Sequence, residues 1–159
     1  MLPRKQLTRE QALQKLRHYC AYQERSHAEV KEKAYSFGLR KPDVEELLSQ
    51  LIQDDYLNEE RFAIAYAGGK FRMKQWGRTK IKYALKQKSV SDYCIKKALR
   101  AIDETQYEQT LANLAQKKYA SLKHEQYLIR KKKTIDFLLQ KGFEPDLVNR
   151  QVEKIRHSG

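Results

Sequence analysis

The feature that most constrains the fold of this chain is an internal repeat of just over 50 residues. Residues 29–52 align with residues 80–103 when moved by 51 positions, and those align with residues 133–156 when moved by 53. Seventeen of the eighteen positions in six columns are then apolar, with Thr134 as the exception. The columns are Val30, Ile81 and Thr134; Ala34, Leu85 and Leu138; Leu39, Val90 and Phe143; Val44, Ile95 and Val148; Leu48, Leu99 and Val152; and Leu51, Ile102 and Ile155. Self-similarity at such a period is typical of tandem helical units.

Helix start and end signals agree with this repeat. Thr8 and Ser26 open capping-box patterns, and Asn58 and Ser91 are residues that favour the N-cap position. Gly38 is placed to end the helix that begins after Ser26. The other predicted helices span about residues 9–23, 42–53, 58–72, 78–87, 92–101, 105–121, 124–140 and 145–157. No segment alternates like a strand, and the six glycines and three prolines are too few for an all-β protein.

Three helices per repeat are expected, because a two-helix hairpin cannot enclose its apolar stripes and a third helix closes the core. We therefore predict an all-α fold of three tandem three-helix repeats, which form an elongated, curved body. The predicted domains are residues 1–53, 54–103 and 104–159.

Composition excludes some classes of protein. No run of eighteen apolar residues is present, so no transmembrane helix is expected, and the N-terminus lacks the apolar centre of a signal peptide. We therefore expect a cytoplasmic protein that is not bound to a membrane. Cys20 and Cys94 lie in apolar-periodic segments, which favours buried, reduced thiols.

Positive charge is concentrated in the middle third of the chain. The formal net charge is +13, and residues 61–100 contain twelve Lys or Arg residues but one acid, Asp92. Residues 41–60 contain one Lys and seven acids. Charge concentrated in this way indicates an anionic partner. The alternative is a solvated helix surface, which is what most runs of charged residues form.

Two clusters are candidates for binding nucleic acid. Basic side chains neutralise phosphates, and an aromatic ring can stack on an unpaired base. For Trp76, packing within the protein is the alternative to stacking on a base. The first cluster contains Lys70, Arg72, Lys74, Trp76, Arg78, Lys80, Lys82, Lys86 and Lys88, and the second contains Arg130, Lys131, Lys132 and Lys133.

The middle of the chain resembles the RecX family, bacterial regulators of the RecA recombinase. Residues 55–63 read DYLNEERFA, similar to the family's Leu-Asp-Asp-x-Arg-Phe-Ala pattern, and residues 77–88 read GRTKIKYALKQK. Arg25-Ser26-x-x-Glu29-Val30 resembles a further family motif. The signature residues here are Leu57, Arg61, Phe62, Gly77, Ile81 and Leu85. Ser89 and Val90 stand where the family has Gly-Ile, and a serine disfavours a left-handed turn at that position.

Two signature residues have structural explanations. Phe62 has the helical spacing of a core residue. Arg61 can pair with Asp54, Asp55 or Glu59 and fix the junction between repeats, or it can contact a ligand.

The resemblance implies a monomeric, non-enzymatic regulator that binds the filament of RecA on single-stranded DNA. It would inhibit ATP turnover and strand exchange, and so affect recombination, DNA repair and the SOS response. The alternatives are an architectural protein that binds single- or double-stranded DNA or RNA without RecA, and a scaffold that binds an acidic protein surface. The sequence contains no Gly-rich phosphate loop and no metal-ligand spacing of its four histidines and two cysteines, so we expect no catalysis, metal or cofactor.

Overall fold

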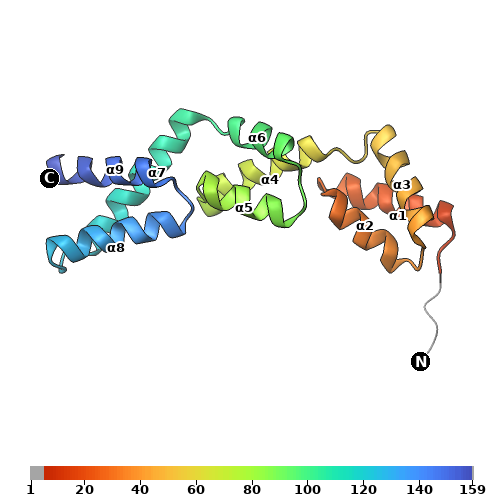
Figure 1. Cartoon of the computed structure of the whole chain (residues 1–159), viewed down its shortest axis with the longest axis horizontal. Coiled ribbons are helices and arrows are strands. Elements are labelled where there is room, and N and C mark those ends of the chain that lie inside the picture. The colour runs from red at the N-terminus through yellow and green to blue at the C-terminus, as the bar shows by residue number, and fades with distance from the viewer. Residues whose placement is uncertain (1–5, 159) are drawn as a thin grey trace, which may run out of the picture. The chain divides into compact units, whose positions relative to one another are not determined.

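The described part of the chain is built from helices joined by short turns. The computed structural model describes the backbone of residues 6–158 and the side chains of residues 6–155. These residues form nine helices and no strand, which confirms the predicted all-α fold (Figure 1). The helices are α1 (Arg9–Tyr22), α2 (His27–Ser36), α3 (Lys41–Gln53), α4 (Glu59–Lys74), α5 (Arg78–Gln87), α6 (Asp92–Arg100), α7 (Glu104–Ser121), α8 (Tyr127–Gln140) and α9 (Pro145–Ser158). In the described range no helix has both the length and the hydropathy needed to cross a membrane.

The helix starts follow the predicted capping chemistry. The Thr8 hydroxyl accepts a hydrogen bond from the backbone N–H of Gln11, whose side chain accepts one from the Thr8 N–H, and this completes a capping box. Ser26 caps α2 by accepting from the Glu29 N–H at 3.1 Å. The Glu29 carboxylate instead pairs with Lys88 Nζ at 3.3 Å, across 59 positions of sequence.

Left-handed residues follow the second helix of each repeat, one of them against expectation. Gly38, Ser89 and Gly142 have φ values of +86°, +61° and +98°. The prediction that a serine would disfavour this turn was wrong. The Ser89 and Val90 N–H groups donate to Lys86 and Leu85 carbonyls, and these bonds satisfy the end of α5 with a Cβ present.

The chain divides into two compact units. The first contains residues up to Ala65 together with Leu85–Lys97, and the second contains Tyr66–Ala84 and residues from Ala98 onward. The helices of the predicted middle repeat, α4 to α6, are shared between these units rather than set apart. The boundaries of the three predicted domains therefore stay a prediction.

The core of the first unit lies between α1, α2 and α3, which pack against one another. Its buried residues come from the apolar stripes of the three helices and from the segments that follow α2 and α3. They are Ala12, Leu16, Cys20, Val30, Ala34, Leu39, Val44, Leu47, Leu51 and Leu57. Cys20 and Cys94 are both free and buried, as predicted.

The second unit places α7, α8 and α9 in mutual contact (Figure 1). Leu138, Phe143, Val148 and Val152 of the apolar columns are buried here. Thr134, the one polar residue in the columns, is also fully buried, and its hydroxyl donates to the Arg130 carbonyl at 2.8 Å. A buried hydroxyl costs little when it is hydrogen-bonded in this way, so Thr134 fits the apolar column.

Replacing Ser89 with Gly is expected to stabilise the chain by about 0.5–1 kcal/mol. Glycine removes the cost of a Cβ in the left-handed region, and the added flexibility of the unfolded chain offsets part of that gain. Chemical denaturation followed by circular dichroism would measure the change. Ser36→Gly, within α2, should instead destabilise the chain, and a loss of stability in Ser89→Gly would contradict the account.

Candidate nucleic-acid interface

Tyr107 of α7 fixes the segment that carries most of the first basic cluster. Its ring is fully buried, with the Phe71 and Phe143 ring centroids 5.7 and 5.2 Å away. The hydroxyl accepts a hydrogen bond from the Arg78 backbone N–H at 2.9 Å and donates to the Glu144 carboxylate. Burial and the Glu144 carboxylate raise the pKa of the Tyr107 phenol, so it remains a neutral donor at physiological pH.

Two glycines bring the turn before α5 against the turn after α8. The Gly77 N–H donates to the Lys141 carbonyl at 2.8 Å, and the Thr79 N–H donates to the Gly142 carbonyl at 2.9 Å. A Cβ on Gly77 would lie 2.4 Å from backbone atoms of Gly142. This close backbone contact requires glycine at Gly77, and it carries Lys141 to the end of α4.

Two lysines then lie beside the Trp76 ring, and two more lie at the end of α4. The Lys70 and Lys80 Nζ atoms lie 5.0 and 4.7 Å from the Trp76 ring centroid. The Lys141 Nζ donates to the carbonyl of Lys74, the last residue of α4, at 2.7 Å. We call Lys70, Lys74, Lys80 and Lys141 the lysine cluster. No described carboxylate forms an ion pair with any of its members.

The positive charges of the lysine cluster repel one another, and no described carboxylate neutralises them. Partial burial lowers the pKa of Lys141, and repulsion from Lys80 and then Lys74 lowers it further. Like charges held together raise the free energy of the folded chain. An anion bound beside them would relieve this repulsion, so the cluster is suited to phosphate or carboxylate groups.

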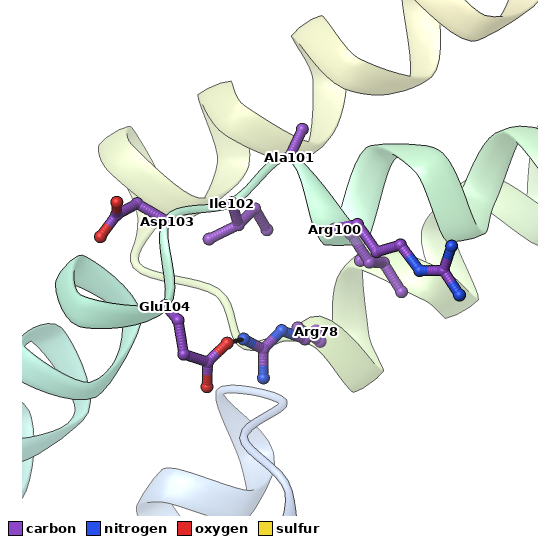
Figure 2. A pocket seen from close by; sticks show the side chains of 7 residues that line it. Arg78, Arg100, Ala101, Ile102, Asp103 and Glu104 are labelled. Atoms are coloured by element: carbon purple, nitrogen blue, oxygen red, sulfur yellow. Dashed lines mark hydrogen bonds and ion pairs between the residues drawn. The ribbon is translucent and has the colours of Figure 1, made fainter.

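Arg78 differs from the lysines because it is already paired. Its guanidinium bonds to Glu144 at 2.8 Å and to Glu104, and it lies 3.7 Å from the Tyr107 ring centroid. Figure 2 shows the Arg78–Glu104 pair at a surface pocket of about 670 Å³, with Arg100 apart from the pair. These contacts support a structural role for Arg78 rather than the predicted contact with nucleic acid.

The other basic residues of the first cluster also include both exposed and paired side chains. Lys82 and Lys86 are exposed on α5, whereas Lys88 pairs with Glu29. The Arg72 guanidinium folds back over the buried Gly68, within 2.7 Å of where a Cβ would stand. Helix α4 continues through Gly68 and through the neighbouring Gly69, whose Cβ position faces open space.

The second predicted cluster is largely neutralised within the protein. Lys131 pairs with Glu153 at 2.7 Å, and Lys133 pairs with Glu125 at 2.6 Å. Lys132 lies 3.8 Å from Asp136. Arg130 stacks on the Tyr119 ring and donates to the Tyr119 carbonyl. These contacts favour the alternative reading of this cluster as an ordinary helix surface.

Comparison with known proteins identifies the family. A model described as "RecX, second three-helix domain" matches residues 58–99, and one described as "RecX, third three-helix domain" matches residues 104–152. Together they cover more than half of the chain. The chain belongs to the RecX family. A crystal structure of RecX from Lactobacillus salivarius superposes with a TM-score of 0.86 at 24% identity, covering 93% of this chain and 96% of that one, and confirms the helical fold.

Two RecX sequences show how far the similarity extends. The regulatory protein RecX of Clostridium perfringens strain 13 is 32% identical over 137 residues, which are 84% of this chain and 63% of that protein. The regulatory protein RecX of Bacillus cytotoxicus is 27% identical over 138 residues, 87% of this chain and 51% of that protein. The chain therefore spans between about half and just under two thirds of the length of these relatives.

Most RecX signature residues serve the fold. Leu57 is buried, and so are Phe62, Ile81 and Leu85, as the spacing of these last three predicts. Gly77 makes the close backbone contact described above. Arg61 pairs with Asp55 at 3.1 Å, one of its predicted partners, and with Glu24 at 2.5 Å. It also donates to the Asp55 carbonyl, so one guanidinium joins the start of α4 to the turns after α1 and α3.

Sequence reasoning missed Lys141, Tyr107 and Glu144. Lys141 lies 67 positions from Lys74, and only the paired turns bring the two together. The glycine at Gly142 indicates a turn next to Lys141, but it gives no indication of what that turn faces. Among the described residues no group of three or more His, Cys, Asp or Glu side chains is arranged to hold a metal ion.

Replacing Gly77 with Ala should destabilise the chain by about 1–3 kcal/mol, because its Cβ meets backbone atoms that cannot rotate away. Gly69→Ala is the matched control: no atom lies within 4 Å of its Cβ position inside α4, so about 0.5–1 kcal/mol of stabilisation is expected. Urea denaturation of both variants measures the difference. Equal effects would contradict the close contact between the two turns.

Replacing Arg78 with Met is expected to destabilise the chain by about 2–4 kcal/mol, because two carboxylates and the face of the Tyr107 ring lose their cation. Arg100→Met, at the same pocket but exposed, should change stability by less than about 0.5 kcal/mol. Thermal denaturation compares the two. If Arg78→Met leaves stability unchanged but weakens DNA binding, the structural assignment is wrong.

Proposed function

We propose that this chain is a non-enzymatic regulator that binds the filament formed by RecA on single-stranded DNA and inhibits its ATP hydrolysis and strand exchange. By this action it would affect recombination, DNA repair and the SOS response. Membership of a family whose relatives are named regulatory proteins supports a regulatory rather than a catalytic role. The link to RecA rests on the resemblance of the sequence motifs given above.

The observation that carries this proposal is the unneutralised lysine cluster around Trp76. Elsewhere among the described residues, several lysines of the predicted clusters have a carboxylate within 4.0 Å, as Lys88, Lys131 and Lys133 do. The exposed Lys82 extends the positive region from the cluster along α5. A filament that contains a strand of DNA along its whole length offers many phosphates to such a surface.

A second candidate function uses the same lysine cluster. An architectural protein could bind naked DNA or RNA through it and have no effect on RecA. An effect on RecA separates the two functions, because both use contacts to phosphates and counterion release makes such contacts steeply salt-dependent in either case. Tight binding to naked DNA with no action on RecA would favour this second candidate.

The decisive measurement is RecA ATP hydrolysis on single-stranded DNA, with this protein added below the RecA concentration. We expect the rate to fall, because a bound regulator at a few positions affects a cooperative filament. Strand exchange measured under the same conditions should fall as well. Unchanged rates in both assays would overturn the proposal.

A charge-reversal variant tests whether the lysine cluster is responsible. Lys74→Glu, Lys80→Glu and Lys82→Glu together should abolish the inhibition, because they place acids where phosphates would bind. The matched control, Lys15→Glu, Lys31→Glu and Lys123→Glu, changes the net charge equally at exposed positions elsewhere and should retain inhibition. Arg78 is left intact because its loss would disturb the fold. Equal loss of inhibition in both variants would indicate a non-specific charge effect.

A further inference from the structure

We propose that the lysine cluster binds the phosphodiester backbone of a nucleic-acid strand, and that Trp76 positions its lysines instead of stacking on a base. Lys141, which follows α8, completes this site. The inference rests on the proposed function in one respect, that the partner contains nucleic acid. Beyond the proposed function, it specifies that phosphate is the group recognised, that Lys141 completes the site and that Trp76 positions the lysines.

Lys141 is held at the end of α4 by its side chain and by its backbone. Its ammonium is held by the Lys74 carbonyl at the C-terminus of α4, where the helix dipole and an unsatisfied carbonyl favour a cation. Its backbone is fixed by the bond from Gly77. This attachment holds a charge beside Lys74 and Lys80 even though both lower the pKa of Lys141. The arrangement is a preformed site for an anion.

Trp76 has lysine side chains beside its ring. The ring is half-buried, and two ammonium groups lie within 5.0 Å of its centroid. Cations are attracted to the face of an indole, whereas stacking on a base needs a ring face free of other groups. The Lys70 Nζ is also 5.5 Å from the Tyr66 ring centroid. Trp76 therefore acts as a positioning residue for Lys70 and Lys80.

The donors available at this site do not distinguish one base from another. Backbone N–H groups at this turn are occupied, since Trp76 donates to the Lys70 carbonyl and Gly77 to the Lys141 carbonyl. The ammonium groups are then the donors available to a ligand. A lysine is a compact charge without the planar fork of arginine, and contacts to phosphate carry no base information. The site should therefore bind a strand regardless of its bases.

The test uses Trp76 fluorescence, since this is the only tryptophan in the chain. The full chain is titrated with a thymidine oligonucleotide and with an abasic oligonucleotide of equal length, both at low salt. We expect affinities within about twofold of each other, because the phosphates are the same in both. An abasic strand that binds more than about tenfold more weakly would overturn the proposal in favour of base stacking.

Variants test the contribution of Lys141. Lys141→Gln should weaken both strands by about fivefold to tenfold and reduce the salt slope by about 0.7, the value for one cation on single-stranded DNA. Lys141→Arg keeps the charge and should restore most of the affinity. Lys123→Gln, at an exposed lysine outside the cluster, should have no effect. Unchanged affinity in Lys141→Gln would overturn the proposal.

Lys80→Gln keeps the test decisive if Lys141→Gln loses stability along with the bond to α4. Lys80 forms no described ion pair, so its replacement should weaken binding without lowering the melting temperature. Polyglutamate is added as a competitor in the same titration. Stronger competition from polyglutamate than from the abasic strand would indicate an acidic protein partner and overturn the proposal.

The two proposals fail separately. If the chain inhibits RecA but binds strands independently of Lys141 and Lys80, only the phosphate site is wrong. If both lysines matter for strand binding but RecA is unaffected, only the proposed function is wrong.

Discussion

The lysine cluster depends on the contacts of one buried phenol. Tyr107 packs between Phe71 and Phe143, accepts a hydrogen bond from the first residue of α5, and donates to Glu144. A buried hydroxyl must have its partners, so these bonds set where the turn before α5 and the turn after α8 can lie. The contact between Gly77 and Gly142 follows from that placement, and so does the approach of Lys141 to α4.

Arginine and lysine have separate tasks in this chain. Arg61 and Arg78 each pair with two carboxylates from other segments, and Arg130 stacks on a tyrosine ring. A planar guanidinium with several donors can join two acceptors at once. Lys70 and Lys80 instead leave their ammonium groups without a carboxylate. The cations that hold the fold together are thus largely different from those proposed to bind phosphate, and the two roles can be tested with different substitutions.

A contact between a cation and an aromatic ring recurs where the first helix of each predicted repeat ends. Arg25 lies over the Tyr19 ring and donates to the Tyr19 carbonyl, and Arg130 does the same at Tyr119. In the middle repeat the ring is Trp76 and the cations are lysines. The arginines are bonded to the backbone of their own tyrosine, whereas the two lysines beside Trp76 remain available. This difference is one reason why we propose a ligand site in the middle repeat.

The sequence by itself determined the helices, several of their caps and most of the buried positions in the apolar columns, because these depend on hydrogen bonds and spacings within a few residues of each other. It also located the excess charge in the middle third. It did not separate Arg78 from Lys80, or predict that Lys131 and Lys133 are neutralised, since their partners lie up to 66 positions away. Only the tertiary structure decided which cations meet carboxylates and which meet one another, because packing of distant turns sets the distances between those charges.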